Sequence, residues 1–176
     1  MPRQRQQSVS FAKRLAYAAP AFSLAVVGIP IYVYIPKFYT DVVGVHIALL
    51  GSIILGIRVF DAVTDPLIGV LSDKTRSRFG RRRPYIAGGA LVLALAIFFL
   101  FNPPEKSPTF ETAWFGIWFF CVFLFWTLVE VPYESLGPEI TFDYHERIAL
   151  FGWRDGALIA GTLVAAASPA MVSGML

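Results

Sequence analysis

The chain has 176 residues, of which 56% are hydrophobic and only 15% are charged, with a formal net charge of +3. A soluble domain carries about 25% charged residues, so this composition excludes an ordinary water-soluble protein and indicates lipid as the solvent. The single cysteine, Cys121, excludes a disulfide within the chain.

The apolar runs predict an all-α, polytopic transmembrane helix bundle. A cytoplasmic N-terminal segment (residues 1–14) is expected to precede five spans, at about 15–38, 46–71, 84–102, 112–137 and 150–176. The first run has 22 residues without charge between Arg14 and Lys37. As a helix it measures about 33 Å, enough for a hydrocarbon core of about 30 Å. Its prolines predict a bent helix, and Pro132 is expected to break the fourth one.

The basic residues lie on one side of these spans. Apart from Arg58, twelve of them flank spans on the side of the N-terminus, and only Lys37 and Lys106 fall on the other side. The positive-inside rule then places the N-terminus in the cytoplasm, and we expect a bacterial inner membrane. Because these charges follow the membrane boundary, nucleic-acid binding is not expected.

The second span carries the residues that are hardest to explain as packing. Arg58, Asp61 and Asp65 are spaced i, i+3 and i+7 on one helix face, with Thr64 between the aspartates. Each charge facing lipid would cost about 3 kcal/mol, so this face must meet a polar interior. An Arg58–Asp61 ion pair leaves Asp65 to bind a cation or a proton. The hypothesis is a coupling-cation site at Asp61, Asp65 and Thr64; the alternative is a structural ion-pair cluster.

The fourth span adds a second polar group. Trp126 stands one turn before Glu130, and Thr127 lies on the same helix face. A carboxylate beside an indole ring suits a polyhydroxylated ligand, through charge-assisted hydrogen bonds and stacking. The alternative is that Glu130 pairs with Arg58 across the bundle.

The loop between the second and third spans, Ser72–Pro84, is strongly basic. One interpretation is an anchor at the cytoplasmic face that also meets anionic lipid headgroups. The other is an inner gate, in which Asp73 exchanges partners among Arg81, Arg82 and Arg83 as the halves of a transporter move.

These segments resemble a known family. The stretch from Asp61 to Gly69, the loop ending Gly80-Arg-Arg-Arg-Pro84, and the segment Glu130-Val-Pro-Tyr are similar to those of the glycoside–pentoside–hexuronide:cation symporters of the major facilitator superfamily. The resemblance implies alternating access in a protein of twelve helices, of which this chain would be an N-terminal fragment. It places the cation-site aspartates, with Na⁺ as the metal if coupling is to sodium, on Asp61 and Asp65.

For the solute, the resemblance implies a binding acid at Glu130. Its other candidate substrate-binding residues are Trp126, Thr127, Arg58 and Arg154. One departure matters, because in melibiose-transporting members the first helix supplies a second sugar-binding aspartate. Here that position is Ala25, which puts a galactoside in doubt.

The sequence therefore predicts a secondary transporter, a symporter of a sugar, glycoside-like or related solute coupled to Na⁺ or H⁺. Its expected partners are a small-molecule solute, the lipid bilayer and a C-terminal half of its own chain. Two alternatives stay open: a transporter-like scaffold with structural carboxylates, and a carrier of a non-sugar solute such as a lysolipid. An enzyme is not expected, because no nucleophile elbow, CxxC or HExxH motif occurs, and no cofactor beyond the coupling ion is expected.

Overall fold

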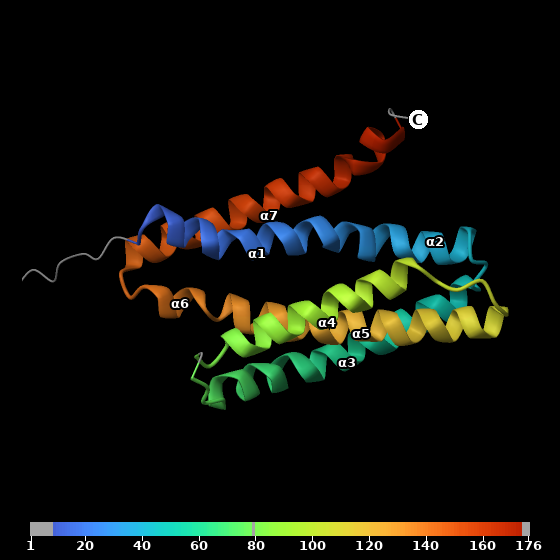
Figure 1. Cartoon of the computed structure of the whole chain (residues 1–176), viewed down its shortest axis with the longest axis horizontal. Coiled ribbons are helices and arrows are strands. Elements are labelled where there is room, and N and C mark those ends of the chain that lie inside the picture. Colours follow the sequence, from blue (N-terminus) through green and yellow to red (C-terminus); the bar gives the residue numbers. More distant parts are fainter. Residues whose placement is uncertain (1–8, 79, 174–176) are drawn as a thin grey trace, which may run out of the picture. The chain divides into compact units, whose positions relative to one another are not determined.

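The computed structural model describes residues 9–78 and 80–173, with side chains as far as residue 169. Within those ranges every regular element is a helix (Figure 1). Five helical stretches are long and apolar enough to cross a membrane. The prediction of an all-α transmembrane helix bundle is confirmed.

The first span contains a change of helix type. α1 (Phe11–Ile29) passes into a π-helical turn, η1 (Pro30–Tyr34), which continues as α2 (Ile35–Asp41). Pro30 and Pro36 lack the N–H group that an α-helix uses, so the regular ladder of hydrogen bonds is interrupted between them. The stretch of 31 residues is long and apolar enough to form one span. The bend expected from its prolines stays a prediction.

The other long helices extend past the charged residues that bounded the predicted spans. They are α3 (Ile47–Lys74), α4 (Arg83–Phe101), α5 (Pro108–Glu134) and α7 (Tyr144–Ser173). α5 begins at 108 rather than 112, and α7 at 144 rather than 150, with Glu111 and Glu146 in their first turns. A negative charge there is stabilised by the N-terminal end of the helix dipole, so it does not stop a helix.

The predicted break at Pro132 is wrong. α5 continues through Pro132 to Glu134, where Ser135 caps it by donating its backbone N–H to the Val131 carbonyl. A proline removes one backbone hydrogen bond from a helix. Because Pro132 is near the end of α5, few later hydrogen bonds are affected, and the helix can continue for its last residues. Pro66 is likewise accommodated inside α3.

The chain divides into two compact units, and the first contains the residues up to Tyr34 and those from Gly137 onward. In this unit α1 lies along α7, and α6 (Gly137–Ile140) precedes α7 (Figure 1). The helices approach closely at Gly161, where an added Cβ would lie 2.6 Å from the Phe22 carbonyl oxygen. At one end the Arg14 guanidinium contacts the Glu146 carboxylate at 2.7 Å.

The second unit, Ile35–Leu136, contains α2, α3, α4 and α5. α5 packs against both α3 and α4, and its buried side chains Phe115, Phe119, Val122 and Phe123 fill the contact. The C-terminal end of α4 is closed by side chains from three segments. Asn102, Trp114 and Tyr39 donate to the carbonyls of residues 98, 99 and 100, at 2.7, 2.9 and 2.8 Å. The last carbonyls of a helix lack the regular partners four residues on, so these three contacts fix this end of α4, together with the backbone N–H of Asn102, which donates to the Phe99 carbonyl at 3.3 Å.

Candidate functional site

Several polar residues of α3 lie on the stripe that it buries. That stripe holds the apolar side chains Leu50, Ile57 and Ile68, and between them Asp61 and Thr64, which are 8% and 9% exposed. On the opposite side of the helix Val59, Val63 and Val70 are exposed, as expected of a surface that meets lipid. α3 therefore presents an apolar face and a mixed face, and the mixed face packs toward α5.

Asp61 has an incomplete set of partners. Its Oδ2 lies 3.5 Å from Nη1 of Arg58, so the ion pair expected from the i, i+3 spacing is present but long. Its Oδ1 is buried and has no hydrogen-bond partner among the residues that the structure describes. A buried carboxylate oxygen without a partner is costly, and in known proteins such atoms have a specific reason to persist.

Arg58 links the two helices. Its guanidinium lies 4.4 Å from the centre of the Phe123 ring on α5, a cation–π contact. Phe123 is one turn before Trp126 and Thr127 on the same helix. The Arg58–Asp61 pair of α3 therefore lies next to the turn of α5 that carries the second polar group.

Asp65 lies at the edge of the buried stripe. At about 100° per residue it is displaced by about 40° from Asp61, on the same side as Arg58, which is displaced by about 60°. The exposed valines lie on roughly the opposite side of the helix. Asp65 is exposed in this chain, but it does not share the apolar face.

Thr64 is anchored to its own helix. Its hydroxyl lies 3.2 Å from the Phe60 carbonyl and 3.3 Å from the Asp61 carbonyl, where it can donate its one proton. The oxygen keeps lone pairs that could still accept or ligate.

On α5, the indole of Trp126 holds the carboxylate of Glu130. Nε1 of Trp126 donates to Oε2 of Glu130 at 2.7 Å, across the single turn that the sequence spacing indicated. Trp126 and Thr127 are buried, and Glu130 is half-buried. This charge-assisted hydrogen bond orients the carboxylate on its helix.

At the other end of this unit, Asp73 and Arg82 come together as proposed for the loop. Nε of Arg82 donates to Oδ1 of Asp73 at 3.2 Å, and a guanidinium N–H also donates to the backbone carbonyl of Ser135, just after α5. Arg82 is only 8% exposed, whereas Arg81 and Arg83 are exposed. The Ser135 contact was not predicted. α5 has no basic residue in its last turn, and that absence was the one available signal, because Arg82 supplies the positive charge that a helix C-terminus favours.

Two residues named from the resemblance belong to the other compact unit. Arg154 pairs with its neighbour Asp155 at 2.9 Å and lies 5.1 Å from the centre of the Phe151 ring. Ala25 faces α7, since a Cβ added at Gly161 would be 3.0 Å from its methyl carbon. An aspartate at position 25 would meet that close helix contact, which is a physical reason for the small residue found there.

Metal-binding capacity is limited to small oxygen-donor groups. Among the residues that the structure describes, no group of three or more His, Cys, Asp or Glu side chains could hold a metal ion. Zinc and similar ions need such clusters. The donor set at Asp61, Thr64 and Asp65 consists of oxygens, which suit a hard cation.

Comparison with known proteins decides the family. The model of the family described as "MFS/sugar transport protein" matches residues 16–176. The chain belongs to this family of MFS transporters. The resemblance to the glycoside–pentoside–hexuronide:cation symporters is confirmed, and with its five apolar helices this MFS chain is an integral membrane protein.

Relatives of this MFS chain carry names of the same kind. It is 37% identical to an uncharacterized symporter of Synechocystis sp., over 90% of this chain and 30% of that protein. It is 39% identical to a protein of Escherichia coli provisionally named glycoside/cation symporter YagG, over 72% of this chain and 27% of that protein. It is 29% identical to the isoprimeverose transporter of Lactiplantibacillus pentosus, over 88% of this chain and 33% of that protein. The chain thus spans about a third of the length of the curated relatives it matches.

Proposed function

We propose that the complete gene product containing this chain is a secondary active transporter that couples entry of a sugar or glycoside-like solute to a Na⁺ or H⁺ gradient. The observation that carries the proposal is Asp61, a carboxylate buried inside a membrane-spanning helix with one oxygen lacking a hydrogen-bond partner among the described residues. Ionisable residues at such positions are costly and mark ion pathways. Family membership and the names of the relatives support the same function.

The coupling cation is assigned to Asp61 and Asp65, with Thr64 as a further oxygen ligand. The three residues lie within one turn of each other on α3, and Arg58 approaches only one oxygen of Asp61. A cation between the carboxylates would offset their mutual repulsion and satisfy Oδ1 of Asp61. A proton on either carboxylate would serve the same purpose, so this geometry supports both forms of coupling.

The solute is assigned to Glu130, Trp126 and Thr127. Glu130, oriented by the indole N–H, can accept hydrogen bonds from solute hydroxyls, and the indole face offers a stacking surface. Arg58 lies close enough to this turn to connect the cation and solute groups through Phe123. Arg154 is proposed as a further solute contact on the resemblance alone.

The Arg82–Asp73 pair is assigned to the cytoplasmic gate, with Arg81 and Arg83 as the residues available for exchange. The assignment is supported by the excess of basic residues on the side of the N-terminus, which favours a cytoplasmic N-terminus. A bacterial inner membrane is part of the same proposal. Breaking a partly buried ion pair of this kind requires compensation, which a moving second half of the transporter would supply.

The test is uptake by the complete gene product in proteoliposomes, with a panel of sugars, glycosides and uronates and imposed Na⁺ or pH gradients. Asp61→Asn and Asp65→Asn should each lower cation-stimulated uptake at least about tenfold, because the charge that draws the cation is removed. The matched control is Asp41→Asn, which removes an exposed carboxylate paired with Lys37 at the end of α2. Cation-stimulated uptake that survives both substitutions would refute the assignment.

Two specific observations favour other functions, and experiments on the same complete gene product distinguish those functions from sugar transport. The Arg58–Asp61 pair is what a scaffold with structural carboxylates would show, and a scaffold should unfold at the same temperature with and without Na⁺. Ala25 in place of an acidic residue favours a non-sugar solute such as a lysolipid. Adding lysolipids to the panel tests that directly.

A further inference from the structure

A cavity of about 300 Å³ lies beside the start of α4, at the end of the molecule where the basic loop joins α3 to α4. It has a polar side and an apolar side. The polar side carries three hydroxyl groups, and the apolar side is formed by small residues of α4 and one leucine of α5. The residues that matter are Thr75, Ser77, Tyr85, Gly88, Gly89 and Leu128.

Two successive glycines create the apolar side. A Cβ added at Gly89 would lie 2.9 Å from Cγ2 of Val129, so α4 approaches α5 closely at that point. A Cβ added at Gly88 would meet nothing within 4 Å, so the helix there presents bare backbone to an open space. The result is a shallow apolar hollow with Leu128 at its base, inside a stretch that is otherwise suited to contact lipid.

The polar side offers hydrogen-bond donors. Oγ1 of Thr75 lies 2.7 Å from the hydroxyl of Tyr85, and either group can be the donor. Oγ1 of Thr75 also lies 2.8 Å from the Leu71 carbonyl. Thr75 has one proton, which goes to the Leu71 carbonyl when Tyr85 donates to Thr75. When Thr75 turns to donate to Tyr85, the Leu71 carbonyl keeps the backbone N–H of Thr75 at 3.1 Å, and the Tyr85 proton becomes available to an acceptor outside the protein.

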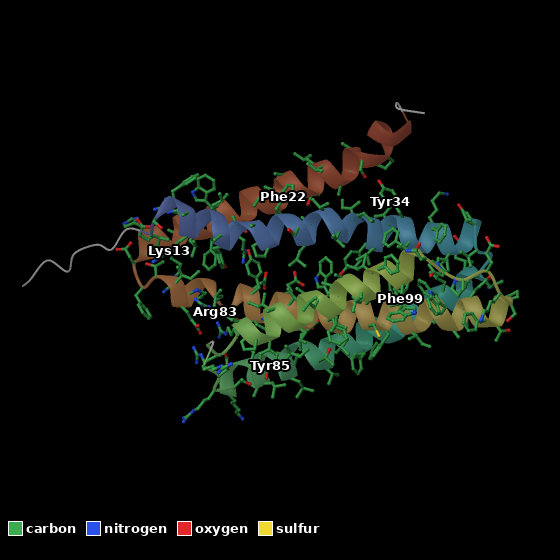
Figure 2. All side chains as sticks on the ribbon, in the orientation of Figure 1. Lys13, Phe22, Tyr34, Arg83, Tyr85 and Phe99 are labelled. Carbon is green, nitrogen blue, oxygen red and sulfur yellow. The ribbon has the colours of Figure 1, made fainter. Side chains whose placement is uncertain are left out.

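The surroundings are strongly positive. The stretch Ser72–Pro84 contains six basic residues and one acidic residue, Asp73, which is already held by Arg82. Lys74, Arg76 and Arg83 are exposed. Figure 2 shows Arg83 and Tyr85 at the same end of α4, opposite the end that carries Phe99. The lining of the cavity itself is uncharged, and basic side chains of the neighbouring loop, at the boundary of membrane helices, attract the phosphate of an anionic lipid.

We propose that this cavity is a binding site for an anionic phospholipid of the inner leaflet. The phosphate is held by the hydroxyl pair of Thr75 and Tyr85 and by the neighbouring basic side chains, and the first part of an acyl chain lies on Gly88 and Leu128. The apolar half of the cavity distinguishes a lipid from a free phosphate, which would gain nothing from that surface. The site rests on the proposed cytoplasmic placement of this loop, and it does not depend on the identity of the transported solute.

The test is native mass spectrometry of the complete gene product in detergent, titrated with phosphatidylglycerol and with phosphatidylcholine of the same acyl chains. The wild-type protein should bind phosphatidylglycerol at least about fivefold more tightly. Gly88→Leu fills the hollow that holds the acyl chain and should weaken binding of phosphatidylglycerol at least about fivefold. Its matched control is Gly56→Leu, because Gly56 is also exposed in a membrane helix and a Cβ there also meets nothing within 4 Å.

A second variant tests the polar side without changing the volume of the cavity. Tyr85→Phe removes the donor and should weaken phosphatidylglycerol about threefold while leaving phosphatidylcholine unchanged. Thermal unfolding of each variant establishes that it is folded.

Three outcomes would overturn the proposal. Equal phosphatidylglycerol affinity in Gly88→Leu and Gly56→Leu would exclude the hollow as the site. Equal affinity of the wild-type protein for both lipids would exclude recognition of the charge. Displacement of phosphatidylglycerol by glycerol phosphate at matched concentration would assign the polar side to a soluble phosphate instead.

Discussion

The indole N–H of Trp126 donates to the carboxylate of Glu130 at 2.7 Å, between two side chains one helical turn apart on α5. Through this contact the protein itself holds the Glu130 carboxylate in one orientation inside a membrane-spanning helix. If the solute binds at Glu130 as proposed, it meets a carboxylate that is already in place, and less conformational freedom is lost on binding.

Replacing Trp126 with Phe should remove this orientation while keeping most of the apolar volume. We expect the KM for the solute to rise about tenfold, since a hydrogen bond to a charged group contributes about 1.5–3 kcal/mol. The control is Trp114→Phe. Trp114 lies on the same helix as Trp126, and the change removes its indole hydrogen bond to the Phe99 carbonyl of α4. It should lower stability and leave KM unchanged; an equal rise of KM in both variants would contradict the role of Trp126.

Replacing Arg58 with Met should strengthen cation binding. The guanidinium lies 3.5 Å from Asp61 and competes with any added cation for that carboxylate. If Na⁺ is the coupling ion, its half-saturating concentration for uptake should fall about tenfold. Lys37→Met, which removes the basic partner of Asp41, should leave it unchanged. A rise or no change in Arg58→Met would indicate a structural ion pair.

Gly161 and Gly156 form a matched pair on α7. An added Cβ at Gly161 would lie 2.6 Å from the Phe22 carbonyl, a backbone atom that cannot rotate away, whereas at Gly156 it would meet nothing within 4 Å. Gly161→Ala should destabilise the protein by about 1–3 kcal/mol. Gly156→Ala should be neutral or stabilising by up to about 1 kcal/mol, because alanine favours a helix. Denaturant unfolding in mixed micelles measures both, and equal effects would contradict the close approach of α1 and α7.

Arg82 should matter more for stability than any other basic residue of its loop. It is buried and bonds both the side chain of Asp73 and the carbonyl of Ser135, so it ties the ends of α3 and α5 to the start of α4. Arg82→Met should destabilise by about 1–3 kcal/mol, since it leaves the Ser135 carbonyl without this donor, whereas the half-exposed Asp73 carboxylate regains water. Arg82→Lys should recover only part of the loss because an ammonium lacks the planar arrangement of donors.

The exposed Arg76 provides the control for that measurement. Arg76→Met should have no detectable effect on unfolding. A comparable loss in both variants would show that the net charge of the loop, and not the contacts of Arg82, sets the stability.

Much of the fold could be predicted from hydrophobic run length. Five spans follow from the requirement that a membrane helix bury about 20 apolar residues, and the i, i+3 ion pair of Arg58 and Asp61 follows from helix geometry. The helix ends were less predictable. Glu111 and Glu146 look like boundaries in a hydropathy plot, yet they lie within the first turns of α5 and α7, where the helix dipole stabilises them.

The sequence by itself determined which residues are too polar for the bilayer: Asp61 and Asp65 on one helix, Glu130 on another, and a basic loop between spans. It did so because a charged side chain is costly to place in lipid, which a single sequence already reveals. Only the tertiary structure decided how those groups are partnered. That Phe123 lies under Arg58, that Ser135 completes the contacts of Arg82, and that one oxygen of Asp61 lacks a partner within the described residues all depend on where α3 and α4 meet α5. Such meetings depend on packing between residues far apart in the chain, and helical periodicity carries no information about them.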